Sequence, residues 1–147
     1  MDSMLSVADL RVDPDPVLRS VAEPVNVGDE LFELGQQMLA VMHAANGVGL
    51  AAPQVGMSRR LFVMSTPLRT LTVCNPSILD HSEPYRPVEG CLSIPGKLFT
   101  PLRHRSIRAR WQQPDGQWIE QVLTGLEAEI FEHEVDHLDG VLLDNRE

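Results

Sequence analysis

The residues with the clearest capacity for chemistry stand near the end of the chain, in the run His133-Glu134-Val135-Asp136-His137. On an α-helix, His133 and His137 project from the same side, so their imidazoles can bind one metal ion. Glu134 lies about 100° further round the helix, where a carboxylate can stand beside the metal without binding it. That is the position of a general base for a metal-bound water. The alternative interpretation is a solvated helix that carries two histidines and several acids by chance.

The flanking residues predict the helix that would position this pair. Thr124 and Glu127 match a capping box at its start, and Gly140 suits its end. Leu126 and Ile130 fall on the same arc of the helix as both histidines, so the pair is expected on the apolar, core-facing side. The sequence therefore favours a buried metal pair over two surface histidines.

A catalytic metal usually has three protein ligands and one position for water, and no His or Cys follows His137. Cys74 stands in an apolar segment and is interpreted as a core residue. Cys91, which follows Gly90 and precedes alternating apolar residues, is the best candidate for the third ligand. A thiolate with two imidazoles suits Fe, Zn, Co or Ni rather than Mg or Ca. A disulfide between the cysteines and a Cys–His nucleophilic pair are the alternatives, but the second leaves Glu134 unexplained.

A run of small residues between 46 and 56 also has an unusual composition. Gly47 and Gly49 flank Val48 and let the backbone approach a neighbour or a ligand closely, and Gln54 offers an amide that donates hydrogen bonds. The alternative is a tight loop after a helix. A phosphate-binding loop is excluded, because its Lys and its glycine spacing are missing.

The length and the net charge of the chain limit the class of protein and its main partners. The 147 residues, 43% of them hydrophobic, suit a single globular domain over residues 1–147 with a sizeable core. The formal net charge of -9 argues against a nucleic acid or an anionic membrane as the main partner, because both attract clustered Lys and Arg. No transmembrane span or signal peptide is recognisable, so we expect a mature soluble chain in the cytoplasm.

The remaining elements follow from periodicity. Apolar residues at helical spacing predict a helix over 29–45, whereas residues 1–26 predict an irregular segment without chemistry. Pro76 is expected to end a strand, and residues 78–87 to form a loop or a strand edge. Short apolar runs predict buried strands at 60–64 and 71–75, and alternating apolar residues predict strands at 106–111 and 118–122 that form a hairpin.

Four large side chains in these segments receive structural interpretations. Trp111 and Trp118 in the predicted hairpin are expected to cover the core. His81, in the polar segment, and His104, among arginines, are expected to face solvent. None of the four is assigned a chemical role.

Three stretches together closely resemble the signature motifs of peptide deformylases, G-x-G-L-A-A-x-Q, E-G-C-L-S and H-E-x-D-H. They are G-V-G-L-A-A-P-Q at 47–54, E-G-C-L-S at 89–93 and H-E-V-D-H at 133–137. They occur in the family's order and at about its spacing, and the resemblance extends to Leu143. It implies an α+β fold in which antiparallel or mixed sheets pack around the helix that carries the histidine pair.

Peptide deformylases remove the formyl group from N-formylmethionine at the start of new bacterial polypeptides. The resemblance implies that Cys91, His133 and His137 hold one divalent metal ion, usually Fe²⁺ in the family and replaceable by Zn²⁺, Ni²⁺ or Co²⁺. It also implies that Glu134 takes a proton from the metal-bound water and hands it to the departing amine.

The same resemblance implies how the N-formylmethionyl peptide or nascent chain is held. The Gln54 amide and the Leu92 backbone N–H stabilise the charge that builds on the formyl oxygen. The peptide lies as an added strand against two segments of the chain, whose substrate-binding residues are Val48, Gly49, Glu89 and Gly90. Formyl is the smallest acyl group, so a tight site can reject acetyl by size.

The chain departs from the family at three points. Glu132 stands where bacterial members usually have Gln, about 200° of helix from Glu134, so little direct effect on the base is expected. Leu98 stands where many members carry Arg, which changes the expected peptide contacts. The sequence ends at Glu147 without the long C-terminal helix that helps common bacterial forms dock on the ribosome. Two alternatives therefore stay open, namely hydrolysis of another small N-formyl substrate and a catalytically inactive metal-binding homologue.

Overall fold

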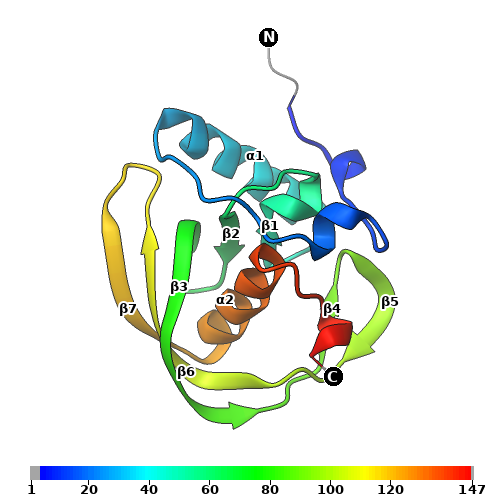
Figure 1. Cartoon of the computed structure of the whole chain (residues 1–147), viewed down its shortest axis with the longest axis vertical. Coiled ribbons are helices and arrows are strands. Elements are labelled where there is room, and N and C mark those ends of the chain that lie inside the picture. Colours follow the sequence, from blue (N-terminus) through cyan, green and yellow to red (C-terminus); the bar gives the residue numbers. More distant parts are fainter. Residues whose placement is uncertain (1–3, 147) are drawn as a thin grey trace.

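A computed structural model describes residues 4–146. Figure 1 shows helix α2 (Gly125–Leu138) at the centre, between a large bent sheet and a smaller pair of strands. The other long helix, α1 (Asp29–Ala44), packs against the far end of the large sheet. The predicted α+β class, with sheets packed around the helix that carries the histidines, is confirmed.

The large sheet has the strand order β1-β2-β3-β6-β7, and every neighbouring pair is antiparallel. The smaller sheet pairs β4 with β5, also antiparallel. The strand bounds are β1 Gly49–Ala51, β2 Leu61–Ser65, β3 Thr70–Tyr85, β4 Glu89–Cys91, β5 Ile94–Phe99, β6 Arg103–Gln112 and β7 Trp118–Thr124. The predicted hairpin is therefore confirmed as β6–β7, and β1 and β4 each have one edge that is not paired within these sheets.

The prediction that Pro76 ends a strand is wrong, because β3 continues to Tyr85. The pairing of β3 with β6 shifts register between Cys74 and Ser77, and Asn75 has a φ of 49°. A bulge is one of the few places in a sheet where the missing N–H of a proline costs no ladder hydrogen bond. The polar segment that follows is a strand rather than a loop, and it gives β6 a long partner.

The central helix buries part of the expected arc and a wider surface besides. Ile130 and His137 are buried as expected, and the core side also includes Ala128, Phe131, Val135 and Leu138, at spacings of three and four residues. Leu126, by contrast, is 50% exposed. The histidines lie on a neighbouring side of the helix, so α2 is buried over most of its circumference instead of along one apolar stripe.

Aromatic contacts fix α2 against the large sheet. The Phe131 ring meets Phe62 of β2 edge to face, with centroids 5.1 Å apart, and Trp111 of β6 at 5.5 Å. Such pairs contribute about 0.5–1.5 kcal/mol beyond the area they bury. Trp111 is a core residue as expected, whereas Trp118 is 44% exposed and lies under the Arg110 guanidinium.

The sequence prediction is wrong for the start of α2 and confirmed for its end. Thr124 is the N-cap residue but makes no side-chain capping bond, and Glu127 accepts a 2.7 Å hydrogen bond from Arg69. The predicted capping box is therefore wrong. Gly140 does end the helix, with a φ of 73°. Its N–H bonds the carbonyl of His137 at 3.2 Å, and the Val141 N–H bonds that of Asp136 at 2.8 Å.

The N-terminal part and α1 follow expectation. Residues 4–26 contain only short 3-10 turns and extended chain, while residues 1–3 of the predicted irregular segment lie outside the described part. Helix α1 begins at Asp29 with Gly28 as its N-cap, and it ends one residue before the predicted boundary. No helix within residues 4–146 combines the length and the apolar character needed to cross a membrane.

Gly140 should tolerate no side chain. A Cβ there would lie 2.7 Å from the carbonyl carbon of Arg19 and 2.8 Å from its oxygen, in addition to the cost of a positive φ. Gly96 has a φ of 80° but no atom within 4 Å of such a Cβ, so it isolates the backbone cost alone. We expect Gly96→Ala to lower the free energy of unfolding by about 1–2 kcal/mol. Gly140→Ala should lower it clearly more in urea titrations, and equal losses would contradict this account.

Candidate active site

Three ligating side chains converge where β4 crosses α2. The Cys91 Sγ atom lies 3.3 Å from His137 Nε2, which lies 3.2 Å from His133 Nε2. All three atoms fall within 4.8 Å of one another. A tetrahedral ion with bonds of about 2.0–2.3 Å needs ligand atoms at roughly these separations, so the residues fit a metal of the zinc or iron type. The structure thus brings together the three predicted ligands.

A buried carboxylate orients one of the imidazoles. The Nδ1 atom of His133 lies 2.8 Å from Glu89 Oε1, which leaves Nε2 free to face Cys91. Metal-binding histidines usually bond a carboxylate through the nitrogen that is not bound to the metal. Burial alone would raise the pKa of Glu89, but hydrogen bonds from His133 and Arg103 lower it to about 2. The Glu89 carboxylate is therefore ionised throughout the neutral pH range.

Arg103 is the functional residue that the sequence did not reveal. It is only 2% exposed, and it donates two 3.0 Å bonds to the carboxylate of Glu89 and one 2.8 Å bond to Asp136. Asp136 also accepts bonds from Arg146 at 2.8 and 3.2 Å. In the sequence, Arg103 simply opens a short basic run. Nothing local distinguishes a buried arginine there from a solvated one.

Glu134 is buried in a way that suits a base. It is 4% exposed, and its Oε1 atom has no hydrogen-bond partner within the described residues. Burial raises the pKa of Glu134 to about 7, so the carboxylate can both accept and return a proton near neutral pH. A Cβ on Gly49 would lie 2.5 Å from Glu134 Oε2. The glycine therefore makes the room in which this carboxylate lies.

The His137 imidazole is kept neutral by its burial. Burial, followed by the nearby His133, lowers the pKa of His137 well below its usual value. The neutral ring is the form that binds a metal through nitrogen. Its Nδ1 atom has no hydrogen-bond partner among the residues described.

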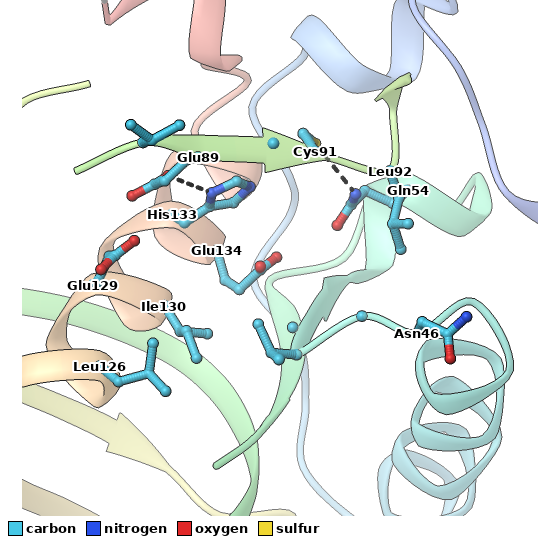
Figure 2. Close-up of a pocket in the computed structure, with 15 residues that line it drawn as sticks. Asn46, Gln54, Glu89, Cys91, Leu92, Leu126, Glu129, Ile130, His133 and Glu134 are labelled. Atoms are coloured by element: carbon cyan, nitrogen blue, oxygen red, sulfur yellow. Dashed lines mark hydrogen bonds and ion pairs between the residues drawn. The ribbon is translucent and has the colours of Figure 1, made fainter. Parts of the chain in front are cut away.

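Gln54 points its amide toward the ligating thiol (Figure 2). It lies in the 3-10 turn Ala52–Val55, where its Oε1 atom accepts a 2.9 Å hydrogen bond from the Ala51 N–H. This bond turns the NH₂ group toward Ser93 Oγ at 3.2 Å and Cys91 Sγ at 3.8 Å. Leu92 follows Cys91 and lines the same space. The amide is thus held as a donor beside the three ligands.

These groups line a cavity of about 430 Å³, a size typical of small-ligand sites. All four predicted substrate-binding residues are on its wall, together with the base and two of the ligands (Figure 2). Strands β1 and β4 border it from opposite sides, each with one edge that is free in its sheet. The lining residues from α2 are Leu126, Glu129, Ile130, His133 and Glu134. An extended peptide could therefore pair with either edge.

The structure shows the surroundings of two residues that depart from the family pattern, Glu132 and Leu98. Glu132 accepts the His104 backbone N–H at 2.8 Å and lies 2.9 Å from its Nδ1 atom, so it ties α2 to β6 on the side away from the cavity. His104 is half-buried, which corrects the expectation that it faces solvent; its ring stacks on the exposed His81. Leu98 is 73% exposed and lies beside Gly90 at the rim.

A thiol and two imidazoles beside an unpaired carboxylate define a class, the metal-dependent hydrolases. Comparison with known proteins narrows this class. The sequence model described as "Polypeptide deformylase" matches residues 7–146. The peptide deformylase of Thermotoga petrophila is 44% identical over 139 residues, covering 93% of this chain and 85% of the relative.

Solved structures agree with the sequence matches. The peptide deformylase of Thermus thermophilus superposes with a TM-score of 0.91 at 41% identity, covering 95% of this chain and 84% of the other. That of Thermotoga maritima gives a TM-score of 0.90 at 42% identity, covering 93% and 95%. The chain belongs to the polypeptide deformylase family, and it is an enzyme of the metal-dependent hydrolase class.

The close contact of Gly49 with Glu134 gives a first test of the site. We expect Gly49→Ala to displace the carboxylate by about 1 Å or more and to lower kcat/KM for formate release from a formyl-methionyl peptide by about 100-fold. Gly47→Ala is the matched control, because the nearest atom to a Cβ there would be a movable methyl of Leu92 at 3.3 Å, with Met42 and the Gly49 carbonyl at ordinary contact distances of 3.5 and 3.6 Å. Equal losses in the two variants would show that the contact with Glu134 is unimportant.

Thiol reactivity tests the metal ligands without an activity assay. Cys74 is fully buried, and burial raises the pKa of its thiol to about 12, so a thiol reagent should not modify it in the folded protein. Cys91 is half-buried at the cavity and should react in metal-free protein. We expect added Zn²⁺ to slow this reaction at least about tenfold, because a bound thiolate is a poor nucleophile. Unchanged reactivity with Zn²⁺, with Cys91→Ala as the blank, would exclude Cys91 as a ligand.

Proposed function

We propose that this chain hydrolyses the N-formyl group of N-formylmethionyl peptides at the cavity described above, within a single catalytic domain over residues 1–147. The observation that carries the proposal is the convergence of three ligating atoms, two of them from residues on the cavity wall, beside Glu134, whose Oε1 atom has no hydrogen-bond partner among the described residues. A purely structural metal site would need neither a free base nor a positioned amide donor.

Cys91, His133 and His137 would hold one divalent metal ion, with Fe²⁺ as the proposed native ion and Zn²⁺, Ni²⁺ or Co²⁺ as replacements. When bound, the ion supplies a Lewis acid that polarises the formyl carbonyl and makes water acidic enough to ionise near neutral pH. The donor set supports this proposal, because thiolate and imidazole ligands favour these ions over Mg²⁺ or Ca²⁺.

Glu134 acts as general base and then as general acid. It takes a proton from the attacking water, whose oxygen forms a bond to the formyl carbon. The carbon–nitrogen bond then breaks, and Glu134 returns the proton to the departing amine, so that formate and a free amino terminus are released. A pKa of about 7 serves both steps, because the group exchanges its proton readily at neutral pH.

Two N–H donors stabilise the negative charge on the formyl oxygen during attack. These are the side-chain amide of Gln54, held by its bond to the Ala51 N–H, and the backbone N–H of Leu92. One preorganised donor of this kind typically lowers the barrier by about 3 kcal/mol. Because Gln54 is fixed before the substrate arrives, little reorganisation opposes this stabilisation.

The peptide lies between the free edges of β1 and β4, against Val48, Gly49, Glu89 and Gly90. The backbone of such a peptide can add main-chain hydrogen bonds as an extra strand, which gives affinity with little dependence on sequence. That mode of binding suits an enzyme whose substrates are many nascent chains with the same first residue. We propose the cytoplasm as its place of action.

Glu134→Gln tests the base directly. The variant should bind metal normally by elemental analysis but release formate from formyl-Met-Ala-Ser at least about 1000-fold more slowly. Glu132→Gln is the matched control, because it makes the same chemical change two residues away on the far side of α2, and it should stay within a few fold of the parent protein. Activity retained in Glu134→Gln would remove Glu134 as the base. Equal release from acetyl-Met-Ala-Ser and formyl-Met-Ala-Ser by the parent would contradict formyl specificity.

A further inference from the structure

The two donors proposed for the formyl oxygen come from separate turns of the chain. Gln54 lies in the 3-10 turn described above, whereas the Leu92 N–H belongs to the tight turn that joins β4 to β5 and has Ser93 as its other central residue. Gln54 and Leu92 both line the cavity (Figure 2). Charge on the formyl oxygen is stabilised well only if both donors are directed at one point. The separation of the two turns must therefore be held.

A short N-terminal segment, Arg11 to Asp13, connects these two turns. The Arg11 N–H donates a 2.7 Å hydrogen bond to the carbonyl of Gln54, and the Asp13 N–H donates a 2.9 Å bond to the carbonyl of Ser93. The intervening N–H, on Val12, makes no hydrogen bond within residues 4–146, and the Val12 side chain is 47% exposed. One segment thus holds both donor-bearing turns through two main-chain bonds.

A side-chain bond closes this arrangement into a ring. The Gln54 amide donates to Ser93 Oγ at 3.2 Å, and both residues are buried. The two turns are therefore linked once through side chains and a second time through the main chain of the N-terminal segment. Several linked bonds limit how far either turn can move alone, and a displacement of about 1 Å at a reacting site can cost about 100-fold in rate.

The segment is itself fixed on both sides. Before it, Leu10 packs against the core cluster that contains the buried side chains of α1. After it, Leu18 is fully buried against Ile94 of β5. Within it, the Asp13 carboxylate accepts a 3.1 Å hydrogen bond from Arg19. These contacts allow the segment to position the two turns instead of moving with them.

We propose that the backbone N–H groups of Arg11 and Asp13 are positioning groups for the reaction, which set the separation of the Gln54 amide and the Leu92 N–H. This inference rests on the proposed function and assigns a role to a segment in which the sequence showed no chemistry. The groups are main-chain atoms, so no residue type or motif marks them.

Replacement of Arg11 by proline tests the first of the two bonds, because proline has no N–H to donate. Leu10 has a φ of -61° and a ψ of 130°, a conformation that a following proline allows. Arg11→Ala keeps the N–H and measures the loss of the half-exposed side chain by itself. Relative to Arg11→Ala, Arg11→Pro should lower kcat for formate release from formyl-Met-Ala-Ser about tenfold. KM should stay within about twofold, because the donors act mainly in the transition state.

Val12→Pro is the matched control, because it removes the neighbouring N–H that has no partner within the described residues. It should keep kcat within about twofold of the parent protein. A double-mutant cycle separates positioning from a general loss of stability: in a Gln54→Ala background, Arg11→Pro should lower kcat by at most about threefold, since the donor that it positions is absent. Each variant is compared at equal zinc content per chain, measured by elemental analysis.

Two outcomes of these assays would overturn the inference, namely equal kcat in Arg11→Pro and Val12→Pro, or a tenfold loss that persists without Gln54. Hydrogen exchange tests it even if Arg11→Pro does not fold. In the zinc-loaded parent, the amide hydrogens of Arg11 and Asp13 should exchange at least about tenfold more slowly than that of Val12, after correction for intrinsic rates, and equal rates would contradict the proposed bonds. A parent that releases no formate would overturn the proposed function, whereas an active parent with an unaffected Arg11→Pro variant would overturn this inference alone.

Discussion

The buried ion-pair network of Arg103 is the interaction on which the metal centre depends. Arg103 on β6 bonds Glu89 on β4 and Asp136 on α2, so one guanidinium joins three elements that are far apart in sequence. Glu89 is two residues from the thiol of Cys91 and also orients the ring of His133. Losing one member of such a network leaves an uncompensated buried charge, which costs about 3–5 kcal/mol. The position of the thiol relative to the imidazoles therefore depends on a residue that touches no metal.

Three glutamates within one cavity have different protonation behaviour because their partners differ. Glu89 is bonded by Arg103 and His133, and its pKa falls to about 2. Glu134 is buried and has one oxygen without a hydrogen-bond partner among the described residues, and its pKa rises to about 7. Glu129 has one hydroxyl donor and a carboxylate neighbour, and its pKa also rises. The same side-chain type can thus orient a ligand or move a proton, according to the charges placed around it.

Two buried polar atoms at the active site lower the stability of the fold. The buried Oε1 of Glu134 and Nδ1 of His137 have no hydrogen-bond partner in the described part of the chain, although most buried polar groups do. The aromatic contacts of Phe131 with Phe62 and Trp111, on the opposite side of α2, hold the helix in place despite these costs. The helix therefore packs against the large sheet with its core side and carries its reactive groups on the side toward the cavity.

The sequence by itself determined the elements whose signal is local, together with the identity of the reacting residues. Spacing along α2 set His133 and His137 on one side, and Gly140 marked the end of that helix because a left-handed residue there favours glycine. Motif order then added Cys91, Gln54 and the family. Periodicity found only part of the buried surface of α2, because the helix is buried on several sides and a single apolar stripe no longer applies.

Only the tertiary structure decided which charges meet. Arg103, Glu132 and Glu129 look alike in sequence to solvated residues, since burial and pairing arise between segments that are 14 to 33 residues or more apart along the chain. The same holds for Pro76, which the bulge in β3 accommodates although its local preference is to end a strand. Pattern along the chain thus specifies which groups can react. Packing between distant strands and the central helix decides how acidic each group is and which way it points.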